Sequence, residues 1–329
     1  MNKLTKIGVS ALCGSLASVA AANAGSLDVT GGATATYTTL DGAVTGNPLG
    51  MATSMTFTGN GELDNGSTFS VTIAHNNKTA YSSSAIALTT PSLGTFTYDE
   101  GGGTGIDRFD DMMPTAWEET TGTGVATGLR SVTGVGGLTD LEWNVGMGLP
   151  EGMNVYASFA PRPHGSKNVN KGTGGAAGST TIDGNGWDIA ASHDALVDGL
   201  TVFVGIGTIE QNSTLGDKDT EVYGATYAIG GATIGYQESE EDNVGVAGKF
   251  YENEAYGISY SVNDDLSVSY GYNESTGSSP GQTVEAESLQ VSYSVGGASV
   301  KIAETSVDNA NYVAGSNQEG RTVALTLAF

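Results

Sequence analysis

Apolar and polar residues alternate one by one along most of the chain. The ending GRTVALTLAF shows the pattern, because every second residue is apolar: Val323, Leu325, Leu327 and Phe329. Successive side chains of a β-strand point to opposite faces, so a period of two predicts strands. The helical period of 3.6 is hard to find. Strands are predicted around residues 27–37, 51–58, 69–73, 141–147, 187–189, 202–206, 223–229, 256–262, 266–273, 289–295 and 322–329.

The connections between these strands come in two alternating sizes. Short turns are expected at residues 63–66, 91–94, 148–152, 194–199, 230–231, 263–265 and 296–297. Longer connections are expected at residues 41–49, 77–82, 99–138, 161–184, 211–218, 241–247, 275–283 and 307–319. Seven short turns alternating with eight long connections predict sixteen strands, with both ends of the chain on the short-turn side.

This connectivity is typical of a transmembrane antiparallel β-barrel. The face opposite the apolar one is made of Ser, Thr, Gly, Asn and acids over whole strands. A closed barrel pairs every backbone group in lipid and has no open edge, and about sixteen strands leave a water-filled channel. We therefore predict an all-β barrel with its apolar face toward lipid. A secreted β-sandwich or solenoid, such as a surface adhesin, is the alternative, although no internal repeat of solenoid length is found.

The N-terminal residues have the features of a secretory signal peptide. Lys3 and Lys6 precede an apolar, small-residue stretch, and Ala22-Asn23-Ala24 is an A-x-A cleavage site. Residues 1–24 are therefore expected to be removed, leaving the barrel in residues 25–329. The single cysteine, Cys13, lies in this segment. Its acylation in a lipoprotein is an alternative that the preceding leucine disfavours, and a mature chain without cysteine excludes disulfide bonds.

The charge balance is strongly negative. The chain has 36 acidic and 12 basic residues and a net charge of -24. This balance argues against binding to nucleic acid, because contacts with phosphates need a basic face.

Several stretches together resemble the general diffusion porins of Gram-negative bacteria, in particular the alphaproteobacterial type. They are, in chain order, SLDVTGGATATYTTL, TFTGNGELDNGSTFSVTIAHN, SLGTFTYDEGGG, YGISYSVNDDLSVSYGYNES and ALTLAF. The resemblance covers essentially the whole mature chain. It implies a homotrimer in the outer membrane whose third external loop, here residues 99–138, folds into the pore. It also implies that Phe329 is the signal read by the barrel-assembly machinery.

The third long connection contains the candidate pore-constriction residues: Asp99, Glu100, Asp107, Arg108, Asp110, Asp111, Glu118, Glu119 and Arg130. Carboxylates in a narrow pore attract cations and repel anions. The chain departs from familiar porins in lacking a cluster of arginines to oppose these acids, so a net negative pore is expected. Apolar neighbours such as Phe109 and Trp117 favour packing inside the barrel over a solvated surface loop, which remains the alternative. Arg108 and Arg130 are candidates to pair with acids and pin the loop.

Alternation also assigns the lumen wall. If apolar positions face lipid, the lumen-facing charged residues are Asp28, Glu142, Asp188, Lys249 and Lys301. A β-bulge would shift this assignment.

The acidic residues and the histidines could serve metal binding or catalysis, or could simply be solvated. Acidic stretches at 107–111, 183–188, 216–221 and 239–243 offer oxygen ligands for Ca²⁺, but none has the full pattern of a calcium-binding loop. The alternative is an acidic rim, which also suits bridging to lipopolysaccharide through divalent ions. The three histidines, His75, His164 and His193, are too far apart in sequence for a zinc motif, and no catalytic arrangement is found.

These observations predict a passive channel for small hydrophilic solutes and ions, with a preference for cations and no enzymatic activity. A substrate-specific outer-membrane channel is the nearest alternative. An aromatic ladder or a row of arginines in the lumen would favour it, and the sequence shows neither clearly.

Overall fold

The structure of the 329-residue chain is a computed structural model. It describes residues 24–41, 46–77, 83–100, 102–136, 139–161, 182–278 and 281–329. The expected signal peptide, apart from Ala24, lies outside the described residues.

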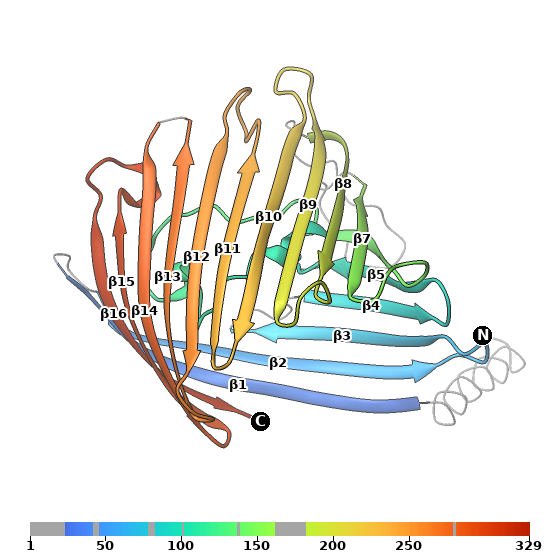
Figure 1. Cartoon of the computed structure of the whole chain (residues 1–329), viewed down its shortest axis with the longest axis horizontal. Helices are drawn as coiled ribbons and strands as arrows, with labels where there is room; N and C mark the ends of the chain where they lie inside the picture. Colours follow the sequence, from blue (N-terminus) through green and yellow to red (C-terminus); the bar gives the residue numbers. More distant parts are fainter. Residues whose placement is uncertain are drawn as a thin grey trace, which may run out of the picture.

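Sixteen antiparallel strands form one closed barrel, in which each strand pairs with its neighbours in sequence and β1 pairs with β16 (Figure 1). The strands are β1 (Ala24–Asp41), β2 (Leu49–Glu62), β3 (Thr68–Asn76), β4 (Ser83–Thr90), β5 (Gly94–Glu100), β6 (Thr139–Val145), β7 (Met153–Ala160), β8 (Ile182–His193), β9 (Leu200–Gln211), β10 (Lys218–Ile229), β11 (Ala232–Glu241), β12 (Tyr251–Ser261), β13 (Leu266–Gly277), β14 (Thr283–Val295), β15 (Ala298–Asp308) and β16 (Gln318–Ala328). The prediction of a sixteen-stranded barrel is confirmed, and the sandwich and solenoid alternatives are wrong.

The barrel closes where the two ends of the chain meet. The pairing of β1 with β16 runs from Gly32 opposite Ala328 to Asp41 opposite Glu319. Phe329 extends it, because its N–H donates to Gly31 O at 3.0 Å and its carbonyl accepts the Gly31 N–H at 3.1 Å. The alternating C-terminal residues therefore form the last strand of the barrel wall. No helix within the described ranges has the length and apolar character needed to cross a membrane.

Short turns and long connections lie at opposite ends of the barrel, as the two sizes predict. Three short 3₁₀ helices occur in the described residues: η1 (Gly105–Phe109), η2 (Thr120–Gly122) and η3 (Ala310–Tyr312). The first two belong to the connection between β5 and β6. The long connections expected near residues 41–49, 77–82, 161–184 and 275–283 fall partly outside the described residues.

The large apolar side chains of the strands are mostly on the outside. Ile258, Leu289 and Leu325 are each about half exposed, and each alternates with residues that face inward. One packed apolar cluster lies inside the barrel, where Ile106, Phe109 and Val132 of the β5–β6 connection meet Ala190, Phe203 and Val222 of the wall. A second cluster joins Val125 of the same connection to Tyr251, Val284 and Val307 of the wall. The barrel thus buries small apolar clusters between this connection and the inner faces of β8 to β10 and of β12, β14 and β15.

Candidate functional site

The connection between β5 and β6 folds into the barrel. We call its described part, residues 102–136, the inner loop. Its teal and green trace passes behind β10 to β14 in Figure 1. Hydrogen bonds and packing join it to wall residues on β6 and β8, on β11 to β15, and on β16. The loop therefore lies along the inner wall on that side, and the inner face of β2 to β4 stays opposite it.

Two wall carboxylates hold the base of the inner loop. Asp188 Oδ2 on β8 accepts the backbone N–H of Val135 at 2.8 Å and that of Ile106 at 3.3 Å. Val135 lies near the end of the inner loop and Ile106 near its start. One side chain of the wall therefore holds both ends of the loop. The glycine at position 134, with φ of +49°, brings the chain so close that an added Cβ would lie 2.3 Å from Asp188.

Glu142 on β6 is the second anchor. Its Oε2 accepts the Gly105 N–H at 2.7 Å and the Ser158 hydroxyl at 3.1 Å, and it forms an ion pair with Arg108. The Arg108 guanidinium also stacks 3.4 Å from the ring centroid of Tyr156. Beside it, the Thr104 hydroxyl donates to Asp140 Oδ1 at 2.8 Å.

Polar side chains on β13 and β14 hold the middle of the inner loop. The Ala116 N–H donates to the Ser269 hydroxyl at 2.8 Å. Gln290 accepts the Trp117 N–H at 3.1 Å and donates to the Glu118 carbonyl at 2.7 Å, so the amide uses both of its ends. These contacts fix the loop across β13 and β14.

The returning part of the loop carries an ion pair. Arg130 donates to Glu241 Oε2 at 3.0 Å, and Lys218 reaches Oε1 of the same carboxylate at 2.5 Å. Glu241 is 1% exposed, so it needs these partners, and the Arg130 guanidinium also lies 4.7 Å from the ring centroid of Tyr251. The sequence-based hypothesis that Arg108 and Arg130 pair with acids agrees with both ion pairs.

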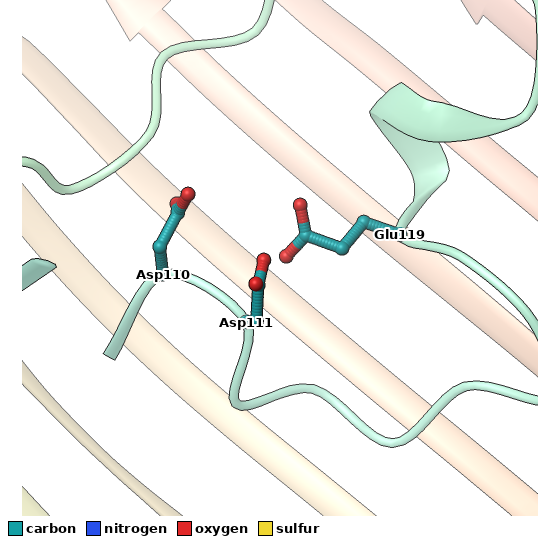
Figure 2. Close-up of side chains that lie close together, drawn as sticks. All are labelled: Asp110, Asp111 and Glu119. Carbon is teal, nitrogen blue, oxygen red and sulfur yellow. The ribbon is translucent and has the colours of Figure 1, made fainter. Parts of the chain in front are cut away.

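Three carboxylates converge between the two arms of the inner loop. Asp110, Asp111 and Glu119 each place an oxygen within 4.8 Å of the others (Figure 2). In the described part of the chain this is the only such group of potential metal ligands. The other candidate calcium-binding stretches, at 183–188, 216–221 and 239–243, lie at or near strand ends, and the acids described there form no such group.

Crowding and burial shift the protonation of this cluster. Burial, followed by repulsion from Asp111, raises the pKa of Asp110 to about 6. Burial and then the charge of Asp110 raise the pKa of Glu119 well above its usual range. The cluster therefore gains negative charge as the pH rises through the neutral range.

The remaining candidate constriction residues lie around the base and middle of the loop. Asp99 and Glu100 are buried at the end of β5, where Asp99 accepts the Gly102 N–H at 2.8 Å and Glu100 accepts the Ser84 hydroxyl at 3.3 Å. Asp107 accepts the Gly103 N–H at 2.6 Å. Burial raises the pKa of both Asp107 and Glu118. The sequence-based set is thus divided, because Asp110, Asp111 and Glu119 come together and the others do not join them.

The wall positions assigned by alternation have different surroundings. Asp28 is exposed near one end of β1. Glu142 and Asp188 are buried beneath the inner loop, and Lys301 on β15 points its Nζ to within 5.9 Å of the Trp117 ring centroid. Lys249 needs a correction, because it lies in the connection between β11 and β12 and not on a strand. β11 ends at Glu241 and β12 begins at Tyr251, so the alternation of the strands does not extend to residue 249.

Several anchoring residues were missed from the sequence. Asp140, Glu241, Ser269 and Gln290 occupy inward positions on their strands, so alternation could have assigned them to the lumen. Only the path of the loop shows that they are anchors.

Most of the positive charge in the described residues is paired with carboxylates. Arg108, Arg130, Lys218 and Arg321 form ion pairs with carboxylates, whereas Lys249 and Lys301 lie over aromatic rings. The described inner face of β1 to β5 has no lysine or arginine. Threonine pairs such as Thr38 with Thr322, 2.9 Å between hydroxyls, line the seam instead. The inner loop thus presents carboxylates toward a wall rich in hydroxyl groups.

Comparison with known proteins supports the fold. The chain matches no protein-family profile and no curated protein sequence. Among solved structures it is similar to Salmonella typhi OmpF in complex with daunomycin, with a TM-score of 0.68 and 15% identity over 92% of this chain and 97% of that chain. An anion-selective porin from Comamonas acidovorans gives a TM-score of 0.65 and 14% identity over 92% and 99%. OmpT of Vibrio cholerae, in trimer form, gives 0.64 and 12% over 93% and 100%. At these identities the likeness shows a shared barrel fold.

Proposed function

We propose that this protein is a passive diffusion channel of the Gram-negative outer membrane that prefers cations and passes small hydrophilic solutes and ions. The observation that carries the proposal is the inner loop, which lies within a closed barrel and presents the cluster of Asp110, Asp111 and Glu119 with no basic partner among the described residues. Fixed carboxylates in a narrow lumen raise the local concentration of cations.

The distribution of bases supports a cation preference over an anion preference. A relative by fold, the Comamonas acidovorans protein, is described as anion-selective, so the fold alone does not decide the sign. In this chain, Arg108 and Arg130 are used by Glu142 and Glu241, which leaves little free positive charge to attract anions.

The environment of the barrel follows from its outer face. The half-exposed apolar side chains of the strands would be costly in water and suit the lipid of a membrane. We propose export through a cleaved signal peptide, insertion by the barrel-assembly machinery, and assembly as a homotrimer. The trimer form of Vibrio cholerae OmpT supports the last of these.

The experiment is a planar-bilayer recording of the purified mature chain under a KCl gradient. A cation-preferring channel gives stepwise conductance and a reversal potential of the sign set by K⁺. A zero potential or one of the opposite sign would reject the cation preference, and an absence of steps from correctly folded barrel would reject the channel.

A second candidate function is binding of a divalent cation such as Ca²⁺ in the same cluster. Besides the three carboxylates, the small cavity lined by Asp110 and Glu119 is also lined by Gln237, whose Oε1 is buried without a hydrogen-bond partner. Oxygen donors of this kind suit Ca²⁺. Terbium luminescence with competition by Ca²⁺ tests it: the signal should be lost in E119Q and kept in E151Q, which changes an exposed turn residue.

A further inference from the structure

The connection between β15 and β16 folds back against the inner loop. We call its residues, 309–317, the last connection; they include η3 and are coloured red in Figure 1. Ala310 and Tyr312 are buried, and both belong to the apolar cluster that contains Val125 of the inner loop. The Tyr312 hydroxyl also lies 2.6 Å from the hydroxyl of Ser275 on β13. The last connection is therefore docked onto both the wall and the inner loop.

The last connection meets the inner loop backbone to backbone. The Asn311 N–H donates to the Thr127 carbonyl at 2.9 Å. Next to this bond, Gly128 has a φ of +74°, and an added Cβ at this position would lie 2.7 Å from the Asn311 Cα. A side chain at position 128 would therefore force the two chains apart, which explains why the position needs glycine.

The stretch of inner loop under this contact, residues 124–129, lies between two points at which the loop is tied to the wall. At one end, the Thr123 hydroxyl lies 2.6 Å from the Thr305 hydroxyl on β15. At the other end, Arg130 forms its ion pair with Glu241 on β11. Because the wall lies behind a stretch that is tied at both ends, the stretch can leave the wall only toward the lumen. Its position therefore affects the width of the pore.

The docked form of the last connection is strained. Asn309, Asn311 and Tyr312 have φ values of +55°, +57° and +61°. Among the described residues other than glycine, five have a φ in this left-handed region, and Tyr312 is the only one of them that is not asparagine. This conformation is unfavourable for a bulky side chain, and such strain persists only where the surrounding contacts enforce it.

Two opposing contributions decide whether the last connection stays docked. Undocking would release the left-handed strain at three positions. It would also expose the buried ring of Tyr312 and break the hydrogen bond from Asn311 to Thr127. Because these contributions have opposite signs, the docked and undocked states differ in free energy by less than the larger of the two. A packed element with two such states can act as a switch.

We propose that the last connection is a latch that sets the open state of the channel, with Asn311 and Tyr312 as its positioning residues. In the docked state it holds residues 124–129 of the inner loop against the wall and leaves the pore open. When it undocks, these residues move into the lumen and close the channel for as long as the latch stays undocked. The proposal rests on the channel in the proposed function and does not depend on the sign of its selectivity.

The test uses two variants of the mature chain that undock the latch from opposite sides. N311P removes the N–H donor and cannot adopt a positive φ. G128A places a Cβ against Asn311. Each variant should increase the hydrogen-exchange rate of the amides in residues 124–129 and the frequency of closures in single-channel recordings about tenfold, the factor that corresponds to about 1.4 kcal/mol. Exchange of residues 104–110, at the anchored base of the loop, should not change.

Each variant has a control that makes the same backbone change elsewhere. Asn77 has a φ of +54°, and its N–H donates to the Thr53 carbonyl at 2.7 Å, so N77P removes an equivalent bond from a different long connection. Gly148 has a φ of +72°, and an added Cβ would meet nothing within 4 Å, so G148A imposes the same strain without a new contact. Both controls should exchange and conduct as the unmodified chain does.

Unchanged exchange and closures in N311P and G128A, or equal changes in N77P and G148A, would overturn the proposal. Faster exchange without more frequent closures would also overturn it, because the released stretch would then not enter the pore. If N311P does not migrate as a folded barrel on unheated gels, G128A alone decides the outcome. An unmodified chain without conductance steps would reject the channel itself, whereas unchanged exchange in a conducting G128A channel would reject the latch alone.

Discussion

Asp188 Oδ2 accepts the backbone N–H of Val135 at 2.8 Å, although 53 residues separate the two in sequence. The same oxygen accepts the Ile106 N–H at 3.3 Å. A single wall carboxylate thus joins both ends of the inner loop to β8, which keeps the loop inside the barrel and places the Asp110, Asp111 and Glu119 cluster within the lumen.

Replacing Asp188 by alanine should loosen the inner loop. Two buried N–H groups would lose their acceptor, at a cost of about 1 to 3 kcal/mol for each group left unsatisfied. We expect larger fluctuations of single-channel current and faster protease cleavage within residues 102–136. D188N, which keeps an acceptor oxygen, should be milder, and D194A on an exposed short turn serves as the control. Current fluctuations and a rate of proteolysis in D188A equal to those of the unmodified chain would contradict the anchoring role.

Replacing Glu241 by alanine should lower the stability of the barrel. Arg130 and Lys218 share this buried carboxylate. Because the Arg130 side chain is itself 36% exposed, water can solvate part of the charge that is left, and we expect a cost of about 1 to 3 kcal/mol, below that of a fully buried pair. The temperature at which the folded band is lost on gels measures the effect. E319A, which removes an exposed acid, should leave that temperature unchanged, and an unchanged E241A would show that the pair does not hold the loop.

The selectivity of the channel should depend on pH. Burial and repulsion raise the pKa of Asp110 to about 6 and raise that of Glu119 above its usual range. A carboxyl with a raised pKa is neutral below that value, so the cluster gains charge as the pH rises from about 5 to about 9. Cation preference should increase over this range. A carboxyl whose pKa is raised by folding holds its proton more tightly in the folded state than in the unfolded state. The free energy of unfolding therefore falls as the pH rises and these carboxyls become charged. Reversal potentials measured across the range, with D110N/E119Q as the control that should flatten the curve, check the prediction.

Removing Phe329 should impair assembly. The structure gives this residue a second role besides the expected recognition signal, because its backbone makes two hydrogen bonds to Gly31 that extend the seam of the barrel. The yield of folded protein in membranes measures the effect. F329A keeps these backbone bonds and removes only the ring, so normal yield for F329A with loss for the deletion would assign the effect to the seam.

The barrel could be predicted from sequence because each strand has its own alternation of apolar and polar residues. In β14, Leu289, Val291 and Tyr293 alternate with inward residues, and turn residues separate the strands at regular intervals. Strand order then follows, since neighbours in sequence pair in space. Lumen positions such as Glu142 and Asp188 follow from the same alternation.

The path of the inner loop could not be predicted in this way. It depends on hydrogen bonds between loop backbone and wall side chains, such as Gly105 with Glu142 and Ala116 with Ser269, which leave no period in the sequence. Alternation predicts that Glu142 faces the lumen, and only the path of the loop shows that it is buried beneath the loop. The meeting of Asp110 with Glu119, nine positions further along the chain, likewise depends on the turn that the anchored loop makes.

The most direct test of the central claim is the reversal potential of D110N/D111N/E119Q in a planar bilayer under a KCl gradient, compared with the unmodified channel and with the control E62Q/E151Q/E319Q. If the carboxylates of the inner loop set the preference for cations, the triple variant should show a reversal potential shifted toward zero, while the control keeps the original value. An unchanged potential in the triple variant, with conductance steps intact, would contradict the claim.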